Sequence, residues 1–294
     1  MSETYRSTKL TSMVNDITFT GQCFSPIERE QKRTLICLPG GGASAEFFNL
    51  APDYSFVQRM TGKGYTVITM DHPGTVTNPL PESHPFLTPR QSADYIAEAL
   101  EGWVEHDTLI GVGHSMGGMM ISLVQARHNM FDAMALLGSS AGGLEWGLTE
   151  EEKTYIDDPE AFSRAIEKLT LNKFKMAFPP STGGPSGKSI TFGGETPALN
   201  QRLRDTSCEL YAAGGMMSMT RGSFKQEVEA LSLPLFFAFG DADIGIPPKD
   251  VPKDYINAES VELIVLENTG HNHFAFSSIN TLCNTLDHWV SNLD

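Results

Sequence analysis

The chain has 294 residues, enough for one large α/β domain with an insertion or for two modest domains. Its formal net charge of −15 argues against nucleic acid and anionic membranes as partners, because both would repel an acidic surface. No apolar run approaches the roughly 20 residues that span a bilayer, and the N-terminus lacks a basic and then apolar signal segment. We therefore expect a cytoplasmic protein whose partner is a small-molecule substrate.

The first part of the chain alternates apolar runs with helical patterns. A loosely alternating stretch over about 13–24 suggests a strand or hairpin at a sheet edge. Residues 34–38 form a continuous apolar run that ends in Pro39-Gly40-Gly41-Gly42, as expected of a buried strand that leads into a glycine-rich loop. The elements predicted next are a helix near 46–62, a buried strand over 65–70 and a helix that begins at Pro89.

An apolar run at 109–112 stops at a serine, Ser115, and a helical pattern begins directly after it. Gly113 and Gly117 flank the serine, so the backbone can pass through a sharp turn where a side chain would collide with its neighbours. This is the G-x-S-x-G pattern of a nucleophile elbow, which projects a serine hydroxyl toward a histidine from another part of the chain. The alternative is an ordinary glycine-rich turn between two core elements.

Strands alternate with helices over most of the chain, with one interruption. After the strand at 133–137, apolar strand runs return only at 235–239 and 261–266, and a helix closes the chain. This rhythm implies right-handed βαβ crossovers and a parallel sheet. We therefore predict an α/β fold with a mostly parallel central sheet flanked by helices, formed by residues 1–143 and 234–294.

The interruption, residues 144–233, is predicted to be an inserted helical cap. It contains helical stretches around Phe162 and over 197–219. Such an insertion should lie over Ser115 and set substrate choice.

Two polar loops follow the last two strands, Gly240-Asp241-Ala242-Asp243 and Gly270-His271-Asn272-His273. The carboxyl ends of parallel strands meet at one edge of a sheet, so a serine, a carboxylate and a histidine can converge there in the chain order Ser, Asp, His. With G-H-S-M-G-G, G-D-A-D and G-H all in place, the chain resembles the α/β-hydrolases over nearly its whole length.

The resemblance implies a role for each of these side chains. Ser115 matches the nucleophile and His271 the general base. Asp243 would orient the imidazole and stabilise its protonated form. His273 is the less favoured base, and Asp241 is interpreted as a turn or capping residue.

The same resemblance implies an oxyanion hole. The N–H groups of Gly41 and Met116 would hold the negative charge that develops on an attacked carbonyl. Pro39 stands where the family usually has a histidine, which leaves open whether Gly41 or Gly42 supplies the second N–H. His114, a common neighbour of the serine in this family, is interpreted as a packed residue beside the substrate site.

The expected activity is hydrolysis of a carboxylic ester of a small, partly apolar substrate through an acyl-enzyme. The same residues could serve a lactonase, thioesterase, amidase, carbon–carbon bond hydrolase or acyltransferase, and a non-catalytic binding protein is an alternative of another class. Met216 and Met217 could be core filler or line an adaptable apolar pocket. No cofactor is required, and the dispersed cysteines and the isolated His271-x-His273 pair argue against a metal site. The oligomeric state stays open.

Overall fold

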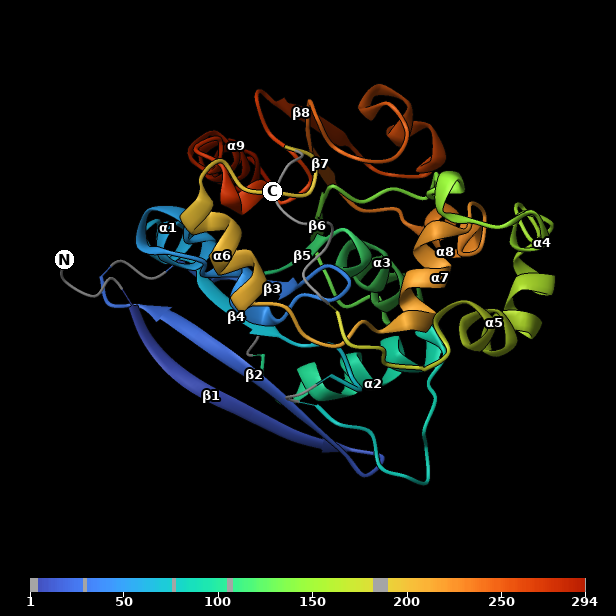
Figure 1. Ribbon diagram of the computed structural model, residues 1–294. Helices are drawn as coiled ribbons and strands as arrows, with labels where there is room; N and C mark the ends of the chain where they lie inside the picture. The colour runs from blue at the N-terminus through green and yellow to red at the C-terminus, as the bar shows by residue number, and fades with distance from the viewer. Residues whose placement is uncertain (1–4, 29–30, 76–77, 105–107, 182–189, 294) are drawn as a thin grey trace.

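A mostly parallel sheet of eight strands forms the centre of the computed structural model, which describes residues 5–28, 31–75, 78–104, 108–181 and 190–293 (Figure 1). In chain order the strands are β1 (Tyr5–Val14), β2 (Ile17–Pro26), β3 (Arg33–Leu38), β4 (Thr66–Met70), β5 (Thr108–His114), β6 (Ala133–Leu137), β7 (Leu235–Gly240) and β8 (Val261–Leu266). Their order in the sheet is β1-β2-β4-β3-β5-β6-β7-β8. The hairpin β1–β2 joins β4 in antiparallel fashion, and all pairs from β4 to β8 are parallel.

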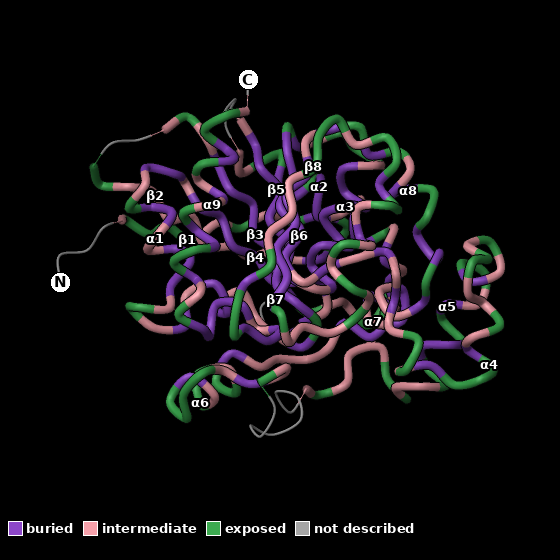
Figure 2. Tube along the Cα trace, turned by 90° about the horizontal axis from the view of Figure 1, so that it is seen from above, coloured by how far each residue is buried: buried purple, intermediate pink, exposed green. Residues whose placement is uncertain are grey.

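Helices cover both faces of the sheet, which confirms the predicted fold class. The helices of the core are α1 (Phe56–Gly62), α2 (Pro89–Glu101), α3 (Met116–His128) and α9 (Ile279–Ser291). The helices α2 and α3 share one hydrophobic cluster with alternate strand residues such as Ile36 and Leu38, whereas α1 and α9 share the other with Leu35 and Cys37. Both faces of each central strand are therefore buried, which explains the continuous apolar runs, and Figure 2 shows these buried strands at the centre of the molecule.

The segment predicted to be a cap enters between β6 and β7. Its elements are η3 (Glu145–Gly147), α4 (Glu150–Lys153), α5 (Pro159–Phe174), α6 (Pro197–Asp205), α7 (Ala212–Met219) and α8 (Lys225–Ala230). In Figure 1, α6 lies on one side of the start of α3 and α7 on the other. The helices α7 and α8 pack against α3, so the insertion is anchored on the core.

Two predicted helices are broken. The first, near 46–62, consists of η1 (Ala45–Phe48), η2 (Pro52–Tyr54) and α1. Pro52 lacks an N–H and begins a new turn, and the Ser55 side chain caps α1 by accepting from Gln58 N at 2.8 Å.

The second, over 197–219, ends at Asp205 and resumes at Ala212. The residues between them bind the glycine-rich loop after β3 instead of continuing the helix. Ser44 N donates to Thr206 O at 2.8 Å, and Cys208 N donates to Gly42 O at 3.0 Å. Backbone bonds from the insertion thus support the loop that was predicted to hold an oxyanion.

The edge hairpin is longer than the sequence pattern predicts. The strand β1 begins at Tyr5, not near residue 13, and most of its side chains are exposed or half-buried. Asn15 and Asp16 form its turn with φ of 47° and 62°, a backbone that Asn and Asp tolerate. Across the described ranges, no helix combines the length and the apolar character needed to cross a bilayer.

Candidate active site

Ser115 lies in the turn between β5 and α3 with φ of 53° and ψ of −121°. A non-glycine residue in this region costs about 1–3 kcal/mol, a strain typical of functional sites. Both flanking glycines are required by close backbone approaches. A Cβ on Gly113 would lie 2.3 Å from Gly118 Cα, and one on Gly117 would lie 2.1 Å from Leu38 O. The geometry is that of a nucleophile elbow.

Backbone donors lie beside this serine. Within the described residues, the N–H groups of Gly41, Gly42 and Met116 have no hydrogen-bond acceptor. A Cβ on Gly41 would lie 3.6 Å from Met116 Sδ, whereas one on Gly42 would face Ser181 Oγ at 2.5 Å. The glycine-rich loop therefore runs along the start of α3, with Gly41 next to Met116.

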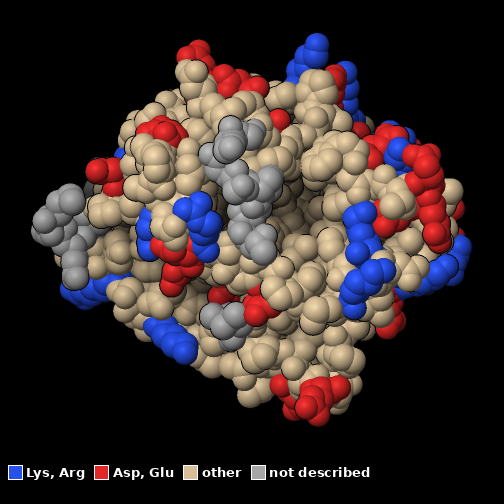
Figure 3. Space-filling view, viewed as in Figure 1, with Lys and Arg blue, Asp and Glu red and all other residues tan. Residues whose placement is uncertain are grey.

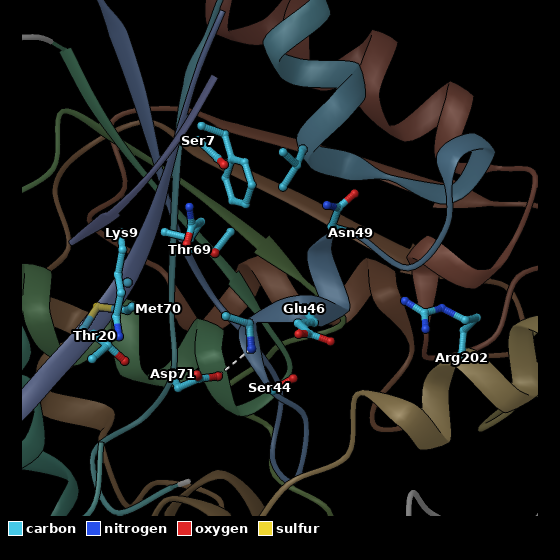
Figure 4. A pocket seen from close by; sticks show the side chains of 15 residues that line it. Ser7, Lys9, Thr20, Ser44, Glu46, Asn49, Thr69, Met70, Asp71 and Arg202 are labelled. Carbon is cyan, nitrogen blue, oxygen red and sulfur yellow. Dashed lines mark hydrogen bonds between the residues drawn. The ribbon is translucent and has the colours of Figure 1, made fainter. Parts of the chain in front are cut away.

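The loop is held in place by the residues that follow β4. His72 Nε2 donates to Pro39 O at 2.8 Å, and burial lowers the pKa of His72, which keeps the ring neutral. Asp71 Oδ1 accepts from Ala45 N at 2.5 Å, the bond drawn in Figure 4. Asp71 also lines a hollow of about 690 Å³ beside the hairpin β1–β2, and this hollow does not include Ser115. Through these two hydrogen bonds, the residues that follow β4 hold the glycine-rich loop in place.

Asp243 binds both histidines of the loop after β8. His271 Nδ1 lies 2.6 Å from Asp243 Oδ1, and His273 Nε2 lies 2.7 Å from Oδ2. Two backbone groups also donate to this carboxylate, Ile244 N to Oδ1 at 2.7 Å and Gly240 N to Oδ2 at 3.2 Å. Burial raises the pKa of Asp243, but the interactions with His271 and the hydrogen bond from His273 outweigh it and hold the pKa well below its usual range. Asp243 is therefore ionised at neutral pH.

Asp241 has a different environment. Its carboxylate accepts from Asn268 N and from Thr269 N, each at 2.9 Å. These backbone bonds, first that of Thr269 and then that of Asn268, lower the pKa of Asp241. Asp241 thus links the loop after β7 to the loop after β8. Of the two acids, Asp243 is the one that contacts His271.

His114 lies between the elbow and the histidine loop. Its Nε2 donates to His271 O at 2.8 Å, and its ring lies against that of His271 with centroids 4.8 Å apart. Burial, together with the neighbouring His271 and His273, lowers the pKa of His114 well below its usual value. A neutral His114 thus supports the backbone of His271.

A pocket of about 320 Å³ contains Ser115, His271 and the glycine-rich loop. Its other lining side chains are mostly apolar and include Leu144, Phe174, Phe192, Leu203, Leu210, Met219 and Ile244. No Asp, Glu, Lys or Arg is among the described residues that line it. Figure 3 shows a hollow near the middle of this face, with an edge formed largely by uncharged residues. Ser115 and His271 share the pocket, although no hydrogen bond joins their side chains.

Of the two alternatives left open for Met216 and Met217, core filler is the one that the structure supports, and their assignment to the substrate pocket is wrong. Their side chains are 0% and 1% exposed and belong to the hydrophobic core, so they do not line the pocket. Ser218 and Met219 of the same helix line it instead. The methionines indicated that this helix could reach the pocket. Which of them face the pocket depends on the rotation of α7 about its axis, and packing on α3 and α5 sets that rotation. Sequence also gave no signal for Ser218.

The comparisons with known proteins agree with this architecture. Residues 35–278 match the model of the family described as Alpha/beta hydrolase family. An alpha/beta hydrolase fold protein from Chitinophaga pinensis superimposes with a TM-score of 0.65 at 12% identity, covering 99% of this chain and 100% of that one. A thermophilic esterase from Thermogutta terrifontis gives 0.63 at 14% identity and coverages of 98% and 99%. The epoxide hydrolase CorEH gives 0.64 at 14% identity and coverages of 98% and 100%. No curated protein matches the sequence.

Proposed function

Because the chain belongs to the alpha/beta hydrolase family, we propose that it is a serine hydrolase that cleaves a carboxylic ester of a small, partly apolar substrate. The observation that carries the proposal is the pocket in which Ser115 and His271 meet the free N–H groups of Gly41 and Met116. Nucleophile, base and oxyanion donors are the parts that acyl transfer through a serine requires.

In the acylation step, Asp243 accepts a hydrogen bond from the Nδ1–H group of His271, which leaves the Nε2 lone pair free to act as a base. When substrate binds, the Ser115 hydroxyl turns toward Nε2 and loses its proton as Oγ attacks the carbonyl carbon. Apo sites often lack this hydrogen bond until substrate is bound. The N–H groups of Gly41 and Met116 hold the oxyanion, and His271 then returns the proton to the leaving alcohol.

In the deacylation step, a water molecule takes the place of the alcohol. His271 removes a proton from this water as it attacks the acyl carbon, and the bond between that carbon and Ser115 Oγ breaks. The proton passes from His271 to Ser115, so the enzyme is restored and one water is consumed for each ester.

The pocket indicates the class of substrate. Its volume of about 320 Å³ lies near the lower end of ligand sites. Because no charged side chain among the described residues faces it, a charged substrate would lose its hydration without gaining a partner. A neutral ester fits this lining, and the carboxylate product would leave readily for the same reason.

Fluorophosphonate labelling tests the proposal, followed by turnover of a panel of aryl esters of rising acyl length, lactones and thioesters. We expect one adduct, located on Ser115 by peptide mapping, and turnover of neutral aryl esters. The Ser115→Ala variant is the matched control. A folded parent protein that takes no label would refute the proposal and favour a non-catalytic binding protein, and a preference for lactones or thioesters would reassign the bond.

A further inference from the structure

His273 shares the carboxylate of Asp243 with His271, and its surroundings define its protonation. Its side chain is 0% exposed, Nε2 lies 2.7 Å from Asp243 Oδ2, and Nδ1 has no partner. An ionised carboxylate only accepts hydrogen bonds, so Nε2 carries the proton. A proton on Nδ1 would be a buried N–H without an acceptor, which is costly. The hydrogen bonds therefore assign the neutral Nε2–H tautomer.

The ring of His273 is also fixed in place. It begins the short helix η5 (His273–Ala275), whose next residue, Phe274, packs against Phe47, Phe48 and Phe56 at centroid distances of 5.1, 5.2 and 5.2 Å. The backbone N–H of His273 donates to His271 O at 3.0 Å. A buried aromatic cluster thus holds His273 against Asp243.

We propose that His273 is a positioning residue for the proposed hydrolysis, acting on His271 through the carboxylate of Asp243. The hydrogen bond to Oδ2 holds the carboxylate in the plane that directs Oδ1 at His271 Nδ1. Without it, Oδ2 would keep only Gly240 N at 3.2 Å, and the carboxylate could rotate. The inference rests on the proposed function, since it assigns His271 as the base.

Two substitutions separate the hydrogen bond from simple packing. His273→Leu removes the donor, and His273→Gln keeps an N–H donor at similar reach. For an aryl ester, we expect His273→Leu to lower kcat about 10- to 100-fold, as for a lost hydrogen bond to a charged group, with KM nearly unchanged. His273→Gln should restore most of the lost kcat. His84→Leu, at an exposed histidine, is the control and should behave as the parent.

An unchanged kcat in His273→Leu would overturn the inference. So would a folded His273→Gln variant as impaired as His273→Leu, because packing would then explain the loss. If His273→Leu fails to fold, the comparison of His273→Gln with the parent keeps the same criterion, since a retained donor must retain kcat.

Nitrogen NMR of histidine-labelled protein tests the contact without any turnover. At neutral pH we expect His273 to be protonated on Nε2 alone, and the Asp243→Asn variant to alter that signal. A proton on Nδ1 would overturn the assignment. A parent protein that shows this tautomer but takes no label on Ser115 refutes the proposed function alone, whereas labelling with an unaffected His273→Leu refutes the inference alone.

Discussion

Replacing Asp243 by asparagine should be among the most damaging single changes in the site. The carboxylate accepts four hydrogen bonds, from His271, His273, Ile244 N and Gly240 N. An asparagine places an NH₂ group where one accepting oxygen was. This NH₂ donor then faces the donors that the oxygen had bound. The side chain is buried, so water cannot relieve this conflict.

The size of the effect depends on which way the amide turns. If its NH₂ faces His271, the imidazole must accept on Nδ1 and carry its proton on Nε2, and loss of the base in this way costs about 10⁴-fold in kcat. If its NH₂ faces His273 instead, that ring must protonate its partnerless Nδ1, while His271 loses an ionised partner worth about 1.5–3 kcal/mol. At about 1.4 kcal/mol for each factor of ten, we expect a fall in kcat between about 10- and 10⁴-fold.

The assay compares Asp243→Asn with Asp241→Asn in steady-state hydrolysis of an aryl ester. Asp241 binds only backbone N–H groups at the surface, so its variant should stay within about 3-fold of the parent, as for an ordinary surface change. Thermal unfolding checks that both variants fold. Asp243→Asn within tenfold of the parent, or Asp241→Asn as the worse variant, would refute the assignment of the acid.

Three further changes follow from the structure. Ser115→Ala should lower turnover about 10⁴-fold or more while thermal unfolding stays near the parent, and activity within tenfold of the parent would rule out a covalent role for Ser115. Met219→Trp should shift the ranking among acyl chain lengths, whereas Met217→Leu should leave it fixed because Met217 lies in the core; equal shifts would contradict the pocket lining. The folded pKa of Asp243 lies below the unfolded value of about 3.9, so its stabilisation is present above that pH and is lost as the pH falls through the lower folded pKa. Chemical denaturation should show that the free energy of unfolding falls more steeply with decreasing pH in the parent than in Asp243→Asn. Equal slopes would count against the depressed pKa.

The central sheet could be predicted because burial on both faces leaves a mark in the sequence. Runs such as 35–38 and 235–239 are apolar throughout, and glycine must occupy positions 113 and 117 where backbones nearly touch. The strand β1 was partly missed because an exposed edge strand needs no apolar pattern. The sequence thus predicted strands correctly where burial required apolar residues, and it missed part of a strand where the side chains are exposed.

Inside the site, sequence order indicated which loops would meet but not how their side chains would pair. The contact between Asp243 and His273 depends on the relative placement of the loops after β7 and β8, and no local pattern encodes that placement. The rotation of α7, which turns Met219 to the pocket and Met216 to the core, depends on its packing against other helices. Both features are tertiary, which is why the sequence left them open.

The inserted segment lines the pocket that contains Ser115, and it also binds the loops around that pocket. Its backbone binds the histidine loop, since His271 N donates to Thr191 O at 2.6 Å and Asn272 Nδ2 donates to Phe192 O at 2.7 Å. On the other side of the pocket, the stretch between α6 and α7 supports the glycine-rich loop through the Cys208 N–H. The proposed base and the proposed oxyanion donors therefore share a scaffold with one wall of the pocket. We therefore expect substrate choice to change with least effect on the proposed chemistry at positions such as Met219, whose side chain lines the pocket while its backbone binds neither of these two loops.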